Sequence, residues 1–204
     1  MRVLNIHPQN PQARLIEQAI AALSAGQLIA YPTDSGYALG WSLGSVANAE
    51  RVRRMRRLDA RHPFTLSCAE LRQIGHFTKM SDSAFRLIKR LTPGPYTFLL
   101  PAAAAVPKRL LSEKRRTIGV RVPDHPISLA LVRALGEPLS TSSLLLPDED
   151  LIGLESDEVA ERLTQKVDLF LDGGACGMEP TTVVDLCGDT PVVIRRGKGE
   201  VDWE

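Results

Sequence analysis

The stretch 31-YPTDSGYALG-40 decides the fold class of this chain. It follows the apolar run Leu28-Ile29-Ala30 and changes abruptly to small, hydroxyl-bearing residues with two glycines. An apolar run bounded by proline, glycine and small polar residues is typical of a strand that ends in a loop. We therefore predict a buried strand over 27–32, followed by a loop of small polar residues that can hold a ligand.

Strand and helix signals alternate outward from this stretch. Apolar residues at helical spacing follow Asn10-Pro11 and stop at Gly26, which predicts a helix before the first strand. Further strands are predicted at 95–100, 118–122, 138–142, 167–171, 181–186 and 191–195, and further helices at 46–58, 82–91, 126–135 and 156–165. Because the elements alternate without a long linker, we expect a single domain over 1–204 with an α/β sheet covered by helices.

The bulk composition is that of a soluble globular protein, with 204 residues, 44% apolar residues, 24% charged residues and a net charge of +1. Any attraction for nucleic acid must therefore come from the distribution of charge. Three cysteines without a CxxC pair predict a reducing compartment and no zinc or disulfide framework. No signal-peptide or membrane-spanning apolar run is visible, so we expect a cytoplasmic protein with no membrane contact.

Hydroxyl-rich segments lie at or within several predicted strands. They are Thr33-Asp34-Ser35, Thr117 to Pro123, 140-STSS-143 and 181-TTVVDL-186. Hydroxyls and amides at strand ends can hold phosphate, carboxylate and ribose groups without a P-loop. For one segment alone, simple turn chemistry explains the residues as well. The four together, with Arg121 at the end of a strand, favour a small-molecule site, and the scattered histidines predict no metal ligands.

Arginines form a second pattern. One predicted helix and its exit carry Arg51, Arg53, Arg54, Arg56, Arg57 and Arg61, and a second segment carries Lys108, Arg109, Lys114, Arg115 and Arg116. Guanidinium groups bind phosphate oxygens bidentately, and like charges at this density repel unless an anion is near. A solvated helix face and a polyanion site are equal alternatives. If the polyanion is double-stranded RNA, tRNA or rRNA, the contacts predicted are Arg53, Arg54, Arg57, Arg61, Arg115 and Arg116.

Taken in order, these segments resemble the YrdC/YciO superfamily, whose best-known members make threonylcarbamoyl-adenylate for tRNA modification. The stretch PTDSGYALG is similar to the family's PT[DE]TxYGLG opening, and the other matching segments are PGPYTFLL, GVRVPDHP, LSTSS, TTVVDL and VVIRRG. The resemblance covers nearly the whole chain and is strongest to the YciO subfamily, for example in FTLSC and STSSLLLP. It implies an open, twisted, mostly mixed sheet with a basic concave face.

The resemblance also implies ligands and site residues. In synthase members the cavity binds ATP and threonine and needs bicarbonate and Mg²⁺, none of them tightly bound, and carbamoylated threonine attacks the α-phosphate to release pyrophosphate. Carried over to this chain, the amino-acid-binding residues are Thr33, Arg121 and Thr182, with Arg121 facing the carboxylate. The nucleotide-binding residues are Arg56, Thr117, Ser140, Ser142 and Arg195.

The chain departs from the synthase pattern at two positions. The family's KxR pair aligns with Arg56 and Leu58, and its SxN motif aligns with Ser142 and Leu144. Losing a hydrogen bond to a charged group costs about 1.5–3 kcal/mol. The resemblance therefore implies a nucleotide-binding protein with weakened synthase activity. The alternatives are a non-catalytic RNA-binding protein acting on tRNA or rRNA, and a residual hydrolase of ATP or acyl-adenylates.

Overall fold

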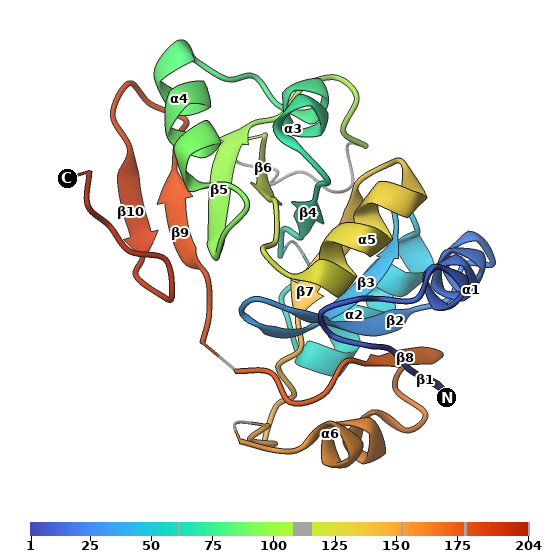
Figure 1. Cartoon of the computed structure of the whole chain (residues 1–204). Helices are drawn as coiled ribbons and strands as arrows, with labels where there is room; N and C mark the ends of the chain where they lie inside the picture. The colour runs from blue at the N-terminus through green and yellow to red at the C-terminus, as the bar shows by residue number, and fades with distance from the viewer. Residues whose placement is uncertain (61, 108–115, 152, 178, 204) are drawn as a thin grey trace.

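The computed structural model describes residues 1–60, 62–107, 116–151, 153–177 and 179–203 (Figure 1). Arg61 and Arg115, two of the predicted RNA contacts, lie outside the described residues. The strands are β1 (Arg2–Asn5), β2 (Ile29–Thr33), β3 (Gly36–Ser42), β4 (Thr65–Ser67), β5 (Tyr96–Pro101), β6 (Thr117–Arg121), β7 (Leu139–Ser143), β8 (Leu169–Asp172), β9 (Thr182–Asp185) and β10 (Val192–Arg195). The helices are α1 (Ala13–Ser24), α2 (Val46–Arg56), α3 (Leu71–Phe77), α4 (Asp82–Leu91), α5 (Pro126–Leu135) and α6 (Ser156–Leu163).

The ten strands form one sheet in the order β1-β8-β2-β3-β7-β4-β6-β5-β9-β10. The sheet is mixed. The pairs β1–β8, β8–β2 and β4–β6 are parallel, whereas the pairs β2–β3, β3–β7 and β7–β4 are antiparallel. Strands β1 and β10 form the two open edges (Figure 1). The prediction of an open, mixed α/β sheet is therefore confirmed.

The stretch 31–40 is a β-hairpin, which corrects the prediction of a strand followed by a loop. Strands β2 and β3 pair antiparallel from Ile29 opposite Gly40 to Thr33 opposite Gly36, so only Asp34 and Ser35 form the turn. Gly40, read as a loop signal, is required by packing, since a Cβ there would lie 2.8 Å from the Tyr31 ring and from Leu139. Gly36 has a φ of 111°, which a residue with a side chain rarely adopts.

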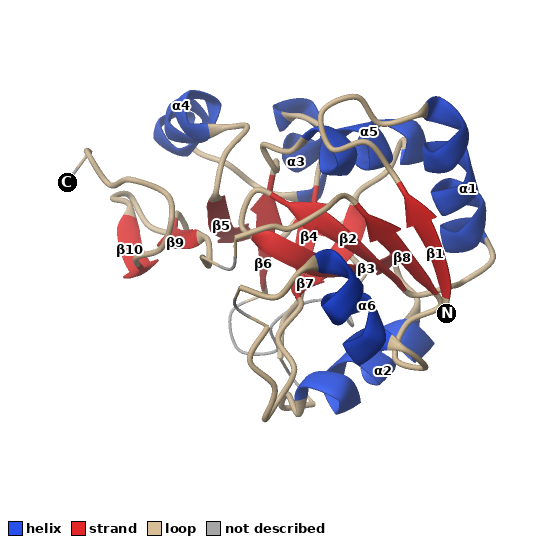
Figure 2. Ribbon diagram, turned by 60° about the horizontal axis from the view of Figure 1, so that its bottom comes forward, coloured by secondary structure: helices blue, strands red, loops and turns tan. Residues whose placement is uncertain are grey.

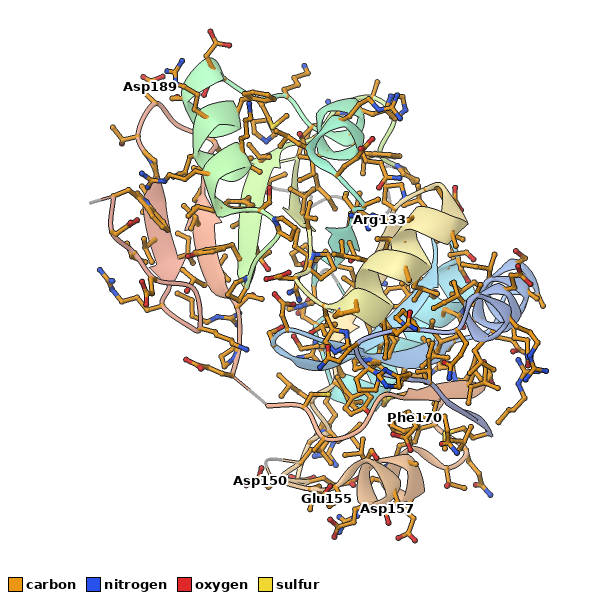
Figure 3. The ribbon with its side chains drawn as sticks, in the orientation of Figure 1. Arg133, Asp150, Glu155, Asp157, Phe170 and Asp189 are labelled. Carbon is orange, nitrogen blue, oxygen red and sulfur yellow. The ribbon has the colours of Figure 1, made fainter. Side chains whose placement is uncertain are left out.

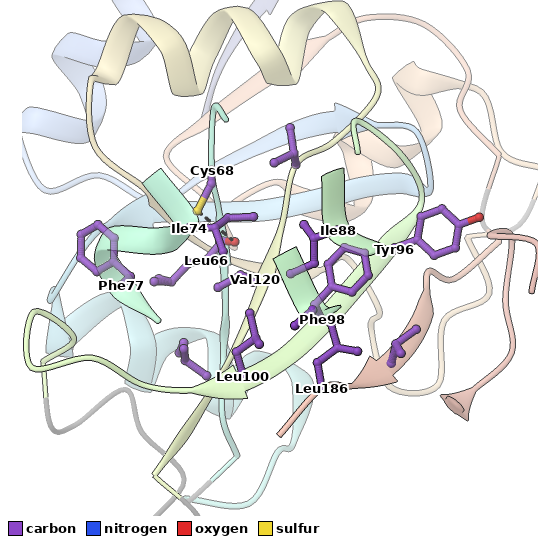
Figure 4. Packing of buried hydrophobic residues seen from close by; sticks show 14 of the residues in the cluster. Leu66, Cys68, Ile74, Phe77, Ile88, Tyr96, Phe98, Leu100, Val120 and Leu186 are labelled. Carbon is purple, nitrogen blue, oxygen red and sulfur yellow. Dashed lines mark hydrogen bonds between the residues drawn. The ribbon is translucent and has the colours of Figure 1, made fainter. Parts of the chain in front are cut away.

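Helices cover both faces of the sheet. Figure 2 shows α1, α3, α4 and α5 on one side and α2 and α6 on the other. Helix α1 buries Ile16, Ala19 and Leu23, as its apolar period predicts. Figure 4 shows the cluster between the sheet and α3 and α4, in which Phe98 packs near Ile88. No described helix has both the length and the apolar character needed to span a bilayer.

Another hydrophobic cluster lies between the sheet and α2 and α6. Phe170 of β8 belongs to it together with Val159 and Leu163 of α6, while Glu155 and Asp157 lie exposed at the start of that helix (Figure 3). The cluster therefore fixes α6, and the segment leading to it, against the sheet.

Three short elements escaped the sequence prediction, namely β1, β4 and α3. Strand β4 has three residues and α3 has seven, too few to show a period. Helix α2 ends at Arg56, two residues earlier than predicted, because Arg57 adopts a left-handed φ of 50°. Two elements with clear caps came out as predicted: α4 follows the Ser81 cap, and α5 lies between Pro126 and Gly136. The Asn10-Pro11 signal was wrong as the start of the first helix, since α1 begins at Ala13 after Gln12.

Candidate functional site

A narrow, partly open pocket lies where the β2–β3 hairpin meets strands β4 to β7. Its lining residues are mostly hydroxyl-bearing: Thr33, Ser35, Tyr37, Ala38, Thr65, Thr97, Arg121, Thr141, Ser142, Ser143 and Thr181. Strand register explains part of the convergence, since Thr141 of β7 lies opposite Thr65 of β4. The pocket volume is about 40 Å³, room for a few water molecules, so a larger ligand must extend through its opening.

The Thr33 hydroxyl organises the hairpin turn at one wall of the pocket. It donates a 2.6 Å hydrogen bond to the carbonyl of Gly36 and accepts one of 3.1 Å from the amide of Ser35. Thr33 itself is buried, at 4% exposure. The turn is therefore held by a side chain that faces the pocket, and the Ser35 hydroxyl lies 3.2 Å from that of Thr33.

Arg121 at the end of β6 is paired within the pocket wall. Its Nη2 contacts the Asp34 carboxylate, and its Nη1 donates to the Ser35 hydroxyl at 3.1 Å. Each side chain of the Arg121–Asp34 pair is only 8% exposed. Among the described residues that line the pocket, Arg121 is the single charged side chain, and Asp34 compensates its charge.

Arg56 of α2 contacts the pocket lining through Ser142. Its Nη1 donates a 2.5 Å hydrogen bond to the Ser142 hydroxyl of β7. Burial lowers the pKa of the Arg56 guanidinium, and its Nε has no partner among the described residues. The structure thus brings together two residues that the family pattern assigns to the nucleotide, one cation and one hydroxyl.

Thr181 lines the pocket, whereas its neighbour Thr182 does not. The Thr181 hydroxyl lies 2.9 Å from that of Thr97, and Arg195 Nη2 donates to the Thr181 carbonyl at 2.8 Å. Thr182 has no exposed surface, and its hydroxyl donates to the carbonyl of Gly199 at 2.6 Å. Thr182 therefore anchors the C-terminal segment, and Arg195 supports the pocket through Thr181.

Two further residues assigned to the nucleotide lie away from the pocket lining. Ser140 is fully buried inside β7, and its hydroxyl has no partner among the described residues. Thr117 begins β6, four residues and thus about 13 Å along the strand from Arg121. Sequence reasoning missed Thr65, Thr97 and Thr141, which lie in the matching segments FTLSC, PGPYTFLL and LSTSS.

The two leucines at the altered motifs belong to one apolar cluster. Leu144 is fully buried with Trp41 and Phe64, and Leu58 packs partly buried against the same cluster. The T-shaped contact of Trp41 with Phe64, at 4.8 Å between ring centroids, closes this region. The sequence predicts a lost phosphate contact at Leu144. The structure shows that its side chain is part of the core.

Burial favours the uncharged forms of two titratable groups near strand β3, Tyr37 and Cys176. The Tyr37 hydroxyl donates to the carbonyl of Gly174 at 2.8 Å, and burial raises the pKa of Tyr37 well above its ordinary value. Burial also raises the pKa of the Cys176 thiol to about 12. Neither group supplies an anionic nucleophile at neutral pH, so the pocket can act by binding and orienting its ligands.

Comparisons with known proteins agree with the fold. A family model described as telomere recombination, for Sua5, YciO and YrdC, matches residues 21–197. The crystal structure of Escherichia coli YciO has 48% sequence identity and a TM-score of 0.93, covering 99% of this chain and 98% of that one. The threonylcarbamoyl-AMP synthase of Pyrococcus abyssi is 31% identical over 189 residues, 89% of this chain and 54% of that protein. The crystal structure of P. abyssi Sua5 complexed with L-threonine has 27% identity and a TM-score of 0.83, covering 97% of this chain and 58% of that one.

Proposed function

Because the chain belongs to the Sua5/YciO/YrdC family, we propose that its pocket binds threonine or a similar amino acid beside ATP and forms threonylcarbamoyl-adenylate slowly. The observation that carries the proposal is the convergence of Thr33, Arg121 and Ser142 on one pocket, with Arg56 bonded to Ser142. These residues come from four separate segments of the chain.

In this proposal the amino acid and the nucleotide bind at opposite ends of the pocket. The amino acid lies at the hairpin turn, where Thr33 and Arg121 offer a hydroxyl and a cation. The nucleotide lies toward Ser142 and Arg56, because a guanidinium there neutralises phosphate charge. Thr182, Ser140, Thr117 and Arg195 act indirectly in this proposal, through the elements that they hold in place.

The reaction needs no protein nucleophile. The amine of the amino acid attacks the carbon of bicarbonate, and water leaves. A carboxylate oxygen of the resulting N-carboxy group then attacks the α-phosphorus of ATP, the bond to the oxygen that bridges the α- and β-phosphates breaks, and pyrophosphate leaves. The protein contributes orientation of the two ligands and charge neutralisation at Arg56. The described residues hold no group of three or more His, Cys, Asp or Glu suited to a metal, so Mg²⁺ would come bound to the phosphates of ATP.

Activity is expected to be weak because the phosphate end of the pocket offers one cation. Arg56 lies there, while Leu58 packs on the apolar cluster and Leu144 is buried within it. Each missing charged hydrogen bond in the transition state costs about 1.5–3 kcal/mol, roughly a tenfold to hundredfold loss of rate.

The test measures pyrophosphate released from ATP with bicarbonate, with and without L-threonine. Threonine-dependent release that falls in Arg56→Gln and persists in Arg54→Gln supports the proposal, since Arg54 is exposed on the same helix. Pyrophosphate release at the same rate with and without threonine indicates an ATP hydrolase. No binding of either ligand by calorimetry overturns the proposal.

A second candidate is binding of double-stranded RNA, tRNA or rRNA, favoured by the exposure of Arg54, Arg57 and Arg116. Arg57 is less available than the sequence suggests, because it forms a 2.7 Å ion pair with Asp148. Arg53 packs over the Phe64 ring, 4.8 Å from its centroid. An RNA duplex should bind with an affinity that falls as salt rises and in Arg54→Gln. Equal binding by that variant at every salt concentration would exclude this surface.

A further inference from the structure

The hydroxyl groups that line the pocket differ in whether the protein already uses them. Most of them bond within the protein, namely those of Thr33, Ser35, Tyr37, Thr97, Thr141, Ser142 and Thr181. The hydroxyls of Thr65 and Ser143 have no hydrogen-bond partner among the described residues. Ser143 is exposed at the end of β7, where water can serve it, whereas Thr65 is half-buried. Thr65 therefore has the one half-buried lining hydroxyl that the described part of the chain leaves unused.

Thr141 lies directly opposite Thr65 in the sheet, yet the two hydroxyls do not bond to each other. The Thr141 hydroxyl donates to the carbonyl of Leu39 at 3.0 Å, which uses its single proton. Its second contact, at 3.0 Å to the Tyr31 hydroxyl, is therefore donated by Tyr31. Burial raises the pKa of Tyr31, so this proton stays on the phenol at neutral pH. Thr141 is held by β3 and β2 and can donate nothing to a ligand.

Gly119 leaves space on the other side of Thr65. The two residues are opposite each other in β6 and β4, so the side chain of Thr65 and a side chain at position 119 would share one face of the sheet. A Cβ at Gly119 would lie 2.9 Å from Thr65 Oγ1 and 3.5 Å from the Thr97 methyl group. Arg121 lies two residues further along β6 and points to the same face. The Thr65 hydroxyl thus lies over a hollow that glycine keeps open.

We propose that Thr65 is a further ligand-binding residue of the pocket, whose hydroxyl donates to an anionic oxygen of the ligand. The inference rests on the proposed function for the ligands and adds to it a residue that the family motifs do not assign. Threonine lining residues look alike in the sequence, but only Thr65 has a proton to offer, because Tyr31 and Leu39 occupy the hydroxyl of Thr141.

An anionic oxygen is the acceptor that fits this donor. The reacting groups of the proposed reaction are a carboxylate and a phosphate, and their ionised oxygens only accept hydrogen bonds. A hydrogen bond to a charged oxygen is also about twice as strong as one between neutral groups. The half-buried position of Thr65 excludes part of the water that would compete for the bond.

The experiment compares Thr65→Val, which keeps the shape and removes the hydroxyl, with Thr65→Ser, which keeps the hydroxyl. Calorimetry measures the affinity for ATP, and pyrophosphate release measures the bicarbonate concentration needed for half-maximal rate. If the acceptor is a phosphate oxygen, Thr65→Val should bind ATP about tenfold more weakly. If it is a carboxylate oxygen, the affinity for ATP should hold and the bicarbonate requirement should rise about tenfold. Thr65→Ser should stay within about threefold of wild type in both measurements.

Thr141→Val provides the matched comparison, because it removes a hydroxyl from the residue opposite. It should unfold at a lower urea concentration than Thr65→Val, since it leaves the buried Tyr31 hydroxyl without its partner, and it should lose less ligand affinity. Thr190→Val, at an exposed position between β9 and β10, should match wild type throughout.

Two results would overturn the assignment while leaving the proposed function standing. One is a Thr65→Val protein with wild-type affinity for ATP and a wild-type bicarbonate requirement. The other is a loss in Thr141→Val as large as that in Thr65→Val. Folded wild-type protein that neither binds ATP nor releases pyrophosphate would overturn the proposed function and this assignment together.

Discussion

Arg56 and Ser142 are joined by a 2.5 Å hydrogen bond, although 86 residues separate them in the chain. The bond ties the last turn of α2 to β7 at the rim of the pocket. A guanidinium held in this way keeps its direction before a ligand arrives, so less side-chain entropy is lost on binding. The pair therefore places a fixed positive charge beside the row of hydroxyls.

The first prediction concerns this charge. Arg56→Gln should weaken ATP binding about tenfold or more, because a charge-assisted hydrogen bond to phosphate is lost. Arg54→Gln removes the same charge from an exposed position on the same helix and should leave affinity nearly unchanged. Calorimetric titration with ATP measures both. Equal losses in the two variants would show that long-range charge, and not the Arg56 site, attracts the nucleotide.

A second prediction follows from the burial of Leu144. Restoring the family's asparagine by Leu144→Asn should destabilise the fold by about 3–5 kcal/mol, because it removes a core side chain and buries an amide. Leu145→Asn changes a neighbour that is 51% exposed and should cost about 0.5 kcal/mol or less. Urea unfolding measures both values. A stable Leu144→Asn protein would mean that the strand end can turn this side chain toward the pocket.

Sequence reasoning found the elements whose signals are local. Helix α5 begins at Pro126 and ends before Gly136, and both signals stand in the sequence. The β2–β3 hairpin was missed because Gly40 was read as a loop signal. In the structure Gly40 lies within β3, and it has no room for a side chain because the Tyr31 ring packs against it, a contact that exists only when the two strands pair. Local signals thus predicted helix limits well and strand pairing poorly.

The same distinction holds for the candidate site. Thr33 and Arg121 stand in motifs and were named from sequence, and the structure places both in the pocket lining. The partnership of Arg121 with Asp34 depends on how β6 lies beside the hairpin, so no spacing reveals it. Thr181 and Thr182 are adjacent in the sequence, so the sequence does not show which of them lines the pocket. In the structure the Thr182 hydroxyl is bonded to the carbonyl of Gly199, which leaves Thr181 to line the pocket.

The third prediction concerns pH. Burial raises the pKa of Asp168, but hydrogen bonds from Arg51, at 2.7 Å, and from the Leu28 amide outweigh it, so the pKa lies below its ordinary value. A carboxyl group with a depressed pKa adds stability above its unfolded-state pKa of about 3.9, and this stability is lost as pH falls through the folded-state value. Asp168→Asn should therefore lower the free energy of unfolding by about 1 kcal/mol at pH 7.

Below about pH 4 the difference between Asp168→Asn and wild type should shrink, because the wild-type carboxyl also becomes neutral. Asp189→Asn, at an exposed position, is the matched control and should follow wild type at both pH values. Urea unfolding at neutral and acid pH gives the comparison. A difference that stays constant with pH would assign the effect of Asp168→Asn to packing.

The last prediction concerns the C-terminal segment that passes the pocket. Gly199 lies so close to Tyr96 that a Cβ would fall 2.3 Å from the ring, and the Tyr96 hydroxyl donates to the carbonyl of Glu200 at 2.9 Å. Gly199→Ala should displace this segment and cost about 1–3 kcal/mol, the range for overpacking. Because Thr182 and Lys198 hold the same segment to β9 and to the hairpin turn, ligand binding should weaken as well. Gly188→Ala is the control, since nothing lies within 4 Å of its added Cβ. Limited proteolysis of the C-terminus and urea unfolding measure the displacement and the loss of stability, and calorimetric titration with threonine measures binding. Equal threonine binding by the two variants would show that the segment contributes nothing to the pocket.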